Sequence, residues 1–196
     1  MRLFDLTLPL TPGLAVQAGD PPFTLDTVLT HSADGYEVTR VCLGTHTGTH
    51  VDAPRHFYAE GRALDEFPLE RFMGRAVVLD CREVSDAVLE ARLTRQLAQH
   101  DMPPDGMAVL WTEGRLITLE AAALLLEAGV GLIGVDAPSL DAAPYPVHRL
   151  LLARDVLIVE NLCGLEQVGA GPIDCAFLPL ALQGTDGAPI RAIAWR

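Results

Sequence analysis

The chain has 196 residues, of which 26 are acidic and 14 basic, so its formal net charge is −12. Such a negative field repels phosphate backbones, and no segment clusters Lys or Arg with aromatic residues, which argues against nucleic-acid binding. Hydrophobic residues make up 49% of the chain, enough apolar surface to exclude a disordered protein. No apolar run reaches the length of a membrane span. We expect one domain covering residues 1–196, in a soluble cytoplasmic protein.

The four cysteines, Cys42, Cys81, Cys163 and Cys175, are widely spaced and form no C-x-x-C pair. This spacing favours neither a thiolate metal site nor a redox motif. We expect all four to be small buried hydrophobic residues of a reduced protein.

Short strands are predicted in the first part of the chain. Residues 3–8 and 23–30 have strand character, and the segment 36–43 is β-branched and roughly alternating. A turn at 32–35 precedes the third segment and predicts a hairpin between the second and third. Residues 76–80 form a continuous apolar run, which is typical of a strand that is buried on both faces.

From about residue 86 onward, helices and strands are predicted to alternate. Helical spacing covers residues 86–99 and 118–128, and Gly129 ends the second helix. Further strands are predicted at 108–111, 131–135, 154–160 and 192–196. Strands first, followed by alternating helices and strands, indicate a single mixed α/β domain.

Three of the six histidines lie within eleven residues, at His46, His50 and His56, together with Asp52. The β-branched residues between them and the nearby Pro54 disfavour a helix, which leaves a strand or an irregular extended loop. In an extended chain, even-numbered side chains share a face, so His46, His50 and Asp52 should converge. His56 lies beyond the proline, and its direction is not determined by this argument.

Two imidazoles and a carboxylate suit Zn²⁺, Mn²⁺ or Fe²⁺ and leave room for a water or substrate oxygen. A catalytic metal site needs such an open position. The alternative is that these residues are ordinary surface or core residues. Three histidines and an aspartate separated by small residues are hard to explain by packing alone.

The run His46-Thr-Gly-Thr-His50-Val-Asp52-Ala-Pro-Arg-His56-Phe resembles the signature of the metal-dependent cyclase/hydrolase superfamily, which includes bacterial kynurenine formamidase. Other segments are similar to the family in kind and order, so the resemblance covers nearly the whole chain. They are residues 5–12, 19–21, 133–139, 148–162 and 177–191.

The resemblance implies a fold of the cyclase-family (swivelling β/β/α) type and one or two divalent ions per chain, zinc before manganese. The implied metal ligands are His46, His50, Asp52, His148 and Glu160. In the formamidase pattern, Asp52 and Glu160 bridge two ions, and His148 binds the second. His56 is implied as the catalytic acid/base, because an imidazole can exchange a proton near neutral pH.

The resemblance also implies a metal-dependent hydrolase of amide-type C–N bonds that uses metal-activated water. The best named reaction is that of an arylformamidase, which converts N-formylkynurenine and water to kynurenine and formate. Gln17 stands where kynurenine formamidases carry a substrate-packing Trp, and this favours a lactone or cyclic-imide hydrolase or cyclase as an alternative. Another alternative is a non-catalytic metal-binding partner protein. A homodimer or homotetramer that acts on a small molecule is expected.

Overall fold

The computed structural model describes residues 1–100 and 102–196. In this part of the chain, the strands are β1 (Leu3–Asp5), β2 (Thr24–Leu29), β3 (Val38–Cys42), β4 (His50–Asp52), β5 (Met73–Asp80), β6 (Gly106–Trp111), β7 (Val130–Val135), β8 (Leu157–Glu160), β9 (Gly171–Pro179) and β10 (Gly187–Trp195). The α-helices are α1 (His31–Asp34), α2 (Asp86–Ala98), α3 (Leu119–Glu127), α4 (Pro146–Leu152) and α5 (Leu165–Val168). Short 3₁₀ turns cover Pro54–His56, Leu64–Glu66 and Leu69–Phe72.

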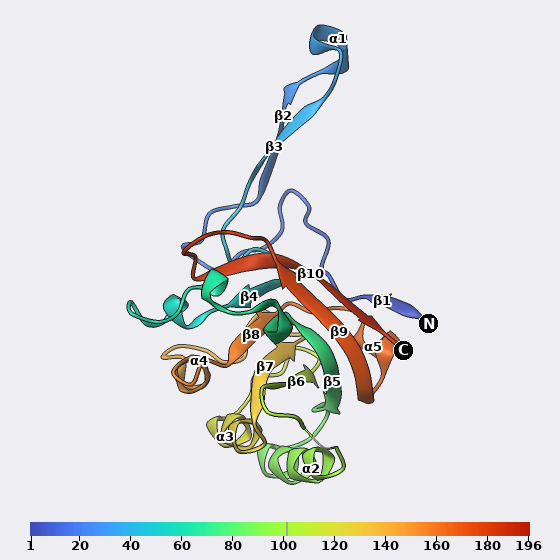
Figure 1. Ribbon diagram of the computed structural model, residues 1–196, viewed down its shortest axis with the longest axis vertical. Helices are drawn as coiled ribbons and strands as arrows, with labels where there is room; N and C mark the ends of the chain where they lie inside the picture. The colour runs from blue at the N-terminus through green and yellow to red at the C-terminus, as the bar shows by residue number, and fades with distance from the viewer. Residues whose placement is uncertain (101) are drawn as a thin grey trace.

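Seven strands close into a mixed barrel in the order β10-β4-β8-β7-β6-β5-β9, because β9 also pairs with β10. Strands β5 to β8 run parallel, whereas β4, β9 and β10 pair antiparallel with their neighbours. Helices α2, α3 and α4 lie outside the barrel beside the parallel strands (Figure 1). The expected single mixed α/β domain is confirmed.

The parallel strands are buried on both faces, as predicted for residues 76–80. Val78 packs in the core that includes β9 and β10, whereas Val77 and Leu79 pack in the core shared with α2 and α3. Alternate residues of one strand therefore supply two separate apolar cores.

Most predicted elements are confirmed, and the errors have local causes. Helix α3 begins after Thr118, whose hydroxyl accepts from the Ala121 amide, and ends before Gly129 at φ 77°. The strand predicted at 154–160 begins only at Leu157, after Asp155 takes a positive φ of 56°. Strand β9 and helix α4 were not predicted, because glycine and proline within or beside them are typical of turns.

Among the described residues, no helix combines the length and apolarity that a membrane span requires.

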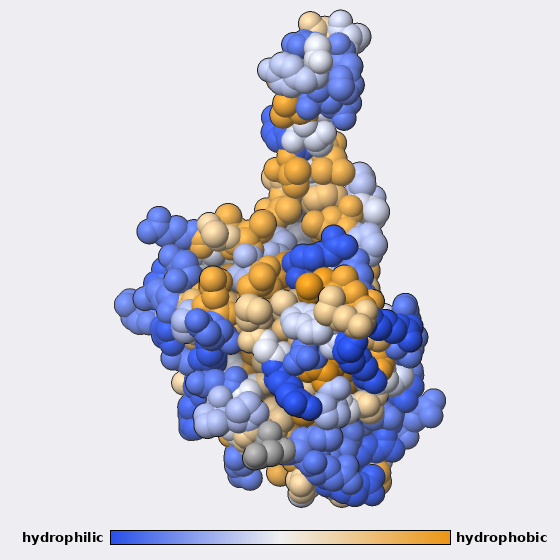
Figure 2. Space-filling view, turned by 45° about the vertical axis from the view of Figure 1, so that its right-hand side comes forward, coloured by the Kyte–Doolittle hydropathy of each residue, from blue (hydrophilic) through white to orange (hydrophobic). Residues whose placement is uncertain are grey.

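Strands β2 and β3 form an antiparallel hairpin arm that projects away from the barrel (Figure 1). The hairpin prediction is confirmed, with α1 and Gly35, at φ 82°, at its tip. Figure 2 shows hydrophobic side chains gathered along the lower arm and at its base.

The cysteine prediction holds for two of the four residues. Cys81 and Cys175 are buried, and burial raises the pKa of each thiol to about 12. Cys163 is only partly buried. Cys42 lies in the arm and is exposed, so the prediction of its burial is wrong, because the arm has no core of its own.

Candidate metal centre

Strand β4 carries His50 and Asp52 into the barrel wall between β10 and β8. The antiparallel register places Glu160, the last residue of β8, directly opposite His50. The Nε2 atom of His50 lies 3.2 Å from Asp52 Oδ1 and 3.5 Å from Glu160 Oε2. Strand pairing thus joins two residues that are 110 positions apart in the sequence.

His46 reaches this cluster from a turn instead of a strand. The chain reverses between residues 44 and 49, where Gly48 has a positive φ of 67°. Thr49 stabilises the turn by donating its hydroxyl to the Asn161 carbonyl, 2.6 Å away. The Nδ1 atom of His46 lies 2.7 Å from Asp52 Oδ1. The predicted convergence of His46, His50 and Asp52 is present, but a shared strand face explains only His50 and Asp52.

Gly187 leaves the space that His46 occupies. It pairs with Asp52 across β10 and β4. A Cβ at this position would lie 2.8 Å from His46 Cε1 and 2.7 Å from the Val51 carbonyl oxygen. Only glycine fits there without displacing the imidazole or the backbone.

Helix α4 positions His148, which is buried. Its Nε2 lies 3.0 Å from Glu160 Oε1 and 3.8 Å from Asp52 Oδ2. Its Nδ1 lies 2.5 Å from Asp141 Oδ1, while the other carboxylate oxygen of Asp141 accepts from the Val147 amide. Asp141 therefore fixes both the helix start and the ring, a role that the sequence did not indicate.

The hydrogen bonds also determine which nitrogen faces the acids. His50 donates from Nδ1 to the Gly48 carbonyl at 2.8 Å, and His148 donates from Nδ1 to Asp141. Each ring consequently presents Nε2 to Asp52 and Glu160. A metal-binding histidine typically has this arrangement, in which a carbonyl or carboxylate holds the nitrogen that does not bind the metal.

Histidines and carboxylates in the cluster shift one another's pKa values. Burial lowers the pKa of His46, but the hydrogen bonds that its ring donates to Asp186 and Asp52 outweigh this effect and raise that pKa to about 10. Burial likewise opposes protonation of His148, but its hydrogen bond to Glu160 raises the pKa to about 9. Burial raises the pKa of Asp52, yet the neighbouring charge of His50 brings it well below its ordinary range. Buried carboxylates at this centre need positive charge close by.

These residues fit a divalent ion. Among the described residues, three groups of three can each place one ligand atom within 4.8 Å of the others: His46, His50 and Asp52; Asp52, His148 and Glu160; and, closer to the surface, His46, His56 and Asp186. Asp52 belongs to the first two groups. Imidazole nitrogens and carboxylate oxygens without a thiolate suit zinc or manganese.

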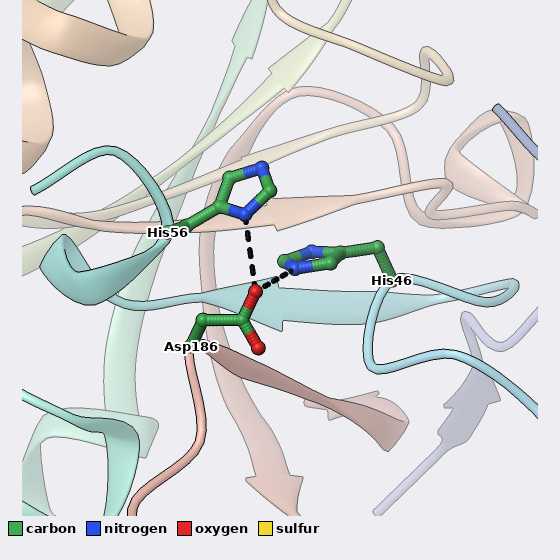
Figure 3. Close-up of side chains that lie close together, drawn as sticks. All are labelled: His46, His56 and Asp186. Atoms are coloured by element: carbon green, nitrogen blue, oxygen red, sulfur yellow. Dashed lines mark hydrogen bonds and ion pairs between the residues drawn. The ribbon is translucent and has the colours of Figure 1, made fainter. Parts of the chain in front are cut away.

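His56 lies at the edge of the cluster. It ends the 3₁₀ turn Pro54–His56, and its ring centroid is 3.9 Å from that of His46. Its Nδ1 lies 3.2 Å from Asp186 Oδ2, and the same oxygen lies 2.9 Å from His46 Nε2 (Figure 3). His56 thus remains outside the two groups that share Asp52, but it contacts His46, a member of one of them. Asp186 is a further residue that the sequence did not indicate, although it lies within the family-like segment 177–191.

Gln17 lies in an exposed turn, in which its carbonyl accepts from the Asp20 amide at 3.0 Å. Leu10 and Pro21, which flank Gln17 in the sequence, contact the turn that carries His46. A Cβ on Gly48 would clash with Leu10, and one on Gly44 would lie 3.1 Å from Pro21. The segment that contains Gln17 therefore packs beside the turn that carries His46.

The family model described as "Putative cyclase" matches residues 4–142. The chain belongs to this cyclase family.

Solved structures match it over almost its whole length. Isatin hydrolase A from Labrenzia aggregata is 25% identical with a TM-score of 0.82, covering 98% of this chain and 93% of that one. A predicted metal-dependent hydrolase from Bacillus stearothermophilus is 26% identical with a TM-score of 0.77, covering 98% and 97%. A potential metal-dependent hydrolase with cyclase activity is 25% identical with a TM-score of 0.78, covering 98% and 96%.

Proposed function

We propose that this protein is a metal-dependent hydrolase of amide-type C–N bonds. The observation that carries the proposal is the convergence of three imidazoles and two carboxylates, from β4, β8, α4 and the turn before β4, beside the half-exposed His56. When bound, a divalent ion lowers the pKa of a water ligand and polarises a substrate carbonyl.

Each side chain has a distinct role in the proposal. His46, His50 and Asp52 hold one ion, and His148 and Glu160 complete a second position that shares Asp52. Zinc is the first candidate and manganese the second, with one or two ions per chain. His56 accepts the proton of the attacking water and returns it to the leaving nitrogen, since an amine departs from an amide only when it is protonated.

Aromatic side chains beside the centre favour an aryl substrate. Phe57 stacks on the His148 ring, with 5.3 Å between the ring centroids. The centroid of the Tyr145 ring lies 5.6 Å from that of Phe57. Both are only partly buried. An aryl amide could pack against such rings, and stacking of this kind contributes roughly 0.5–1.5 kcal/mol. The best named reaction is hydrolysis of N-formylkynurenine to kynurenine and formate, as in an arylformamidase.

A second candidate is the opening of a cyclic amide, imide or lactone, or the reverse ring closure. Gln17 in place of a substrate-packing Trp favours it. The similarity to isatin hydrolase A supports it as well, because isatin is a cyclic amide fused to an aromatic ring. Both candidates require the same ligands and the same proton transfer by His56.

The test begins with elemental analysis of the purified protein, for which we expect about one or two divalent ions per chain. A panel of N-formyl anilides, cyclic imides and lactones is then assayed with zinc or manganese present. His56→Ala should retain the metal and lose about 10²–10⁴-fold in kcat, whereas His50→Ala should lose the metal.

Folded protein that binds no divalent ion would refute the metal site. Metal-loaded protein that hydrolyses nothing in the panel would instead favour the alternative of a non-catalytic metal-binding partner protein. The expected homodimer or homotetramer and the cytoplasmic location stay predictions.

A further inference from the structure

The Asp186 carboxylate connects two histidines that have different proposed roles. Its Oδ2 atom lies 2.9 Å from His46 Nε2 and 3.2 Å from His56 Nδ1, and both rings converge on it (Figure 3). Its other oxygen, Oδ1, accepts from the Thr45 hydroxyl at 3.0 Å. Three groups from two separate turns therefore meet at one side chain.

An ionised carboxylate accepts hydrogen bonds but cannot donate them. Each ring nitrogen that faces Asp186 must therefore carry a proton. The other nitrogen of His46, Nδ1, faces a second carboxylate, because it lies 2.7 Å from Asp52 Oδ1; when the centre is loaded, Nδ1 is the nitrogen that would be available to the ion. In neutral His56, the proton on Nδ1 leaves Nε2 as the only nitrogen that can accept a proton.

We propose that Asp186 is a positioning residue that holds His56 in the Nδ1–H tautomer, with Nε2 available for proton transfer, and that it orients the metal ligand His46 through the same oxygen. This inference rests on the proposed function and extends it to a residue outside the predicted ligand set.

Asp186 is itself held in place. Its backbone carbonyl accepts from the Ala53 amide at 2.8 Å, just before the turn that contains His56. The next residue, Gly187, has no side chain to displace His46. Phe57 meets the His56 ring edge-on, with 4.9 Å between centroids. The His56 ring is thus confined by its contact with the tilted His46 ring, by Phe57 and by the carboxylate.

A carboxylate in this position has two effects on a histidine acid/base. It selects the tautomer whose free nitrogen faces the reaction, and it stabilises the imidazolium after the proton has been taken up. An amide side chain in its place can also donate, so it no longer imposes the tautomer. We therefore expect Asp186→Asn to lower kcat on the order of 10²–10⁴-fold with little change in KM.

The experiment compares wild type, Asp186→Asn, His56→Ala and the double variant, all loaded with zinc. The control is Asp65→Asn. Asp65 accepts from the Gly184 amide at 2.9 Å and so supports the same loop, but it makes no hydrogen bond to an imidazole among the described residues. The readouts are zinc content, kcat and KM, and the His56 tautomer from ¹⁵N–¹H correlation spectra at alkaline pH.

At saturating zinc, we expect Asp186→Asn to keep its ion, although with weaker affinity because His46 loses its carboxylate partner. We expect the same variant to lose turnover and to shift His56 away from the Nδ1–H tautomer, while Asp65→Asn behaves as wild type. Adding Asp186→Asn to His56→Ala should cause little further loss, because residues that act through one another are not additive. The proposal is overturned if Asp186→Asn lowers kcat by the same factor in the His56→Ala background as in wild type. It is also overturned if the His56 tautomer is unchanged in Asp186→Asn. The tautomer is read without any substrate, so it decides this inference even if no compound in the panel is hydrolysed.

Discussion

The centre has a buried half and a rim half, and they differ in exposure and in how their polar atoms are satisfied. The buried half comprises His50, Asp52, Asp141, His148 and Glu160; the rim half comprises His46, His56 and Asp186. The side chain of Asp52 is 2% exposed and that of His148 is 4% exposed, whereas His56 and Asp186 are 32% and 36% exposed.

Under the proposed function, the buried half binds the ion together with His46, and His56 at the rim transfers the proton. In the buried half, each imidazole is fixed by a carbonyl or carboxylate behind it and faces two acids. In the rim half, one carboxylate faces both rings, and His56 is accessible to solvent. We therefore expect changes in the buried half and at the ligand His46 to act on metal affinity and stability, and changes at His56 and Asp186 to act mainly on turnover.

The largest effect is expected at Asp52, which is common to both groups of ligands. Asp52→Asn removes a buried charge that faces His46, His50 and His148, and should abolish metal binding. Breaking a buried pair costs roughly 3–5 kcal/mol of unfolding free energy. Denaturant titration and elemental analysis measure both effects.

The matched control for this variant is Asp26→Asn, which breaks the exposed pair of Asp26 with Arg40 in the arm. It should cost no more than about 1 kcal/mol and leave the metal content unchanged. Equal destabilisation by the two variants would contradict the distinction between buried and exposed charge.

A medium effect is expected at Asp141, which touches His148 but belongs to neither group of ligands. Asp141→Asn should weaken metal affinity about 10–100-fold, because a histidine that loses its carboxylate partner is a poorer and less oriented ligand. Competition with a chromogenic chelator measures the affinity.

Asp155→Asn is the comparison for Asp141→Asn. Asp155 has a positive φ of 56°, which Asn tolerates, and its carboxylate pairs only with Arg62 among the described residues. The Asp155→Asn variant should leave the metal affinity unchanged. An unaltered affinity in Asp141→Asn would show that the buried half does not depend on this support.

The smallest effect is the pH dependence of stability, and it involves both halves. In chelator-treated protein, the pKa values of His46 and His148 are raised to about 10 and about 9. Since both lie above the unfolded value, the stability that these groups contribute is complete below about pH 6.5 and is lost as the pH rises through 9 to 10. Zinc binds the deprotonated rings, so its affinity should change in the opposite direction.

The gain in Tm on adding zinc should therefore be larger at about pH 9 than at about pH 6. Thermal scans of chelated and zinc-loaded protein at the two pH values measure it. A gain that is independent of pH would mean that the ion does not displace protons from these histidines.

The sequence by itself predicted the fold class, most of the elements and the grouping of His46, His50 and Asp52, with His56 close to them in the chain. These depend on local information, because strand and helix periodicity and the spacing of a short motif can be read from neighbouring residues. His148 and Glu160 came only from the family resemblance. From local pattern alone, His148 reads as a surface residue and Glu160 as a solvated strand end, yet both are buried.

Only the tertiary structure decided how these residues meet. The pairing of β4 with β8 places Glu160 opposite His50, and the turn at Gly48 brings in His46, which a common strand face cannot explain. Asp141 contacts the imidazole of His148, and Asp186 contacts those of His46 and His56, although no local sequence pattern around either aspartate predicts this role. Their roles depend on the packing of α4 and of the loop before β10 against a distant strand, and such long-range contacts leave no local pattern in the sequence.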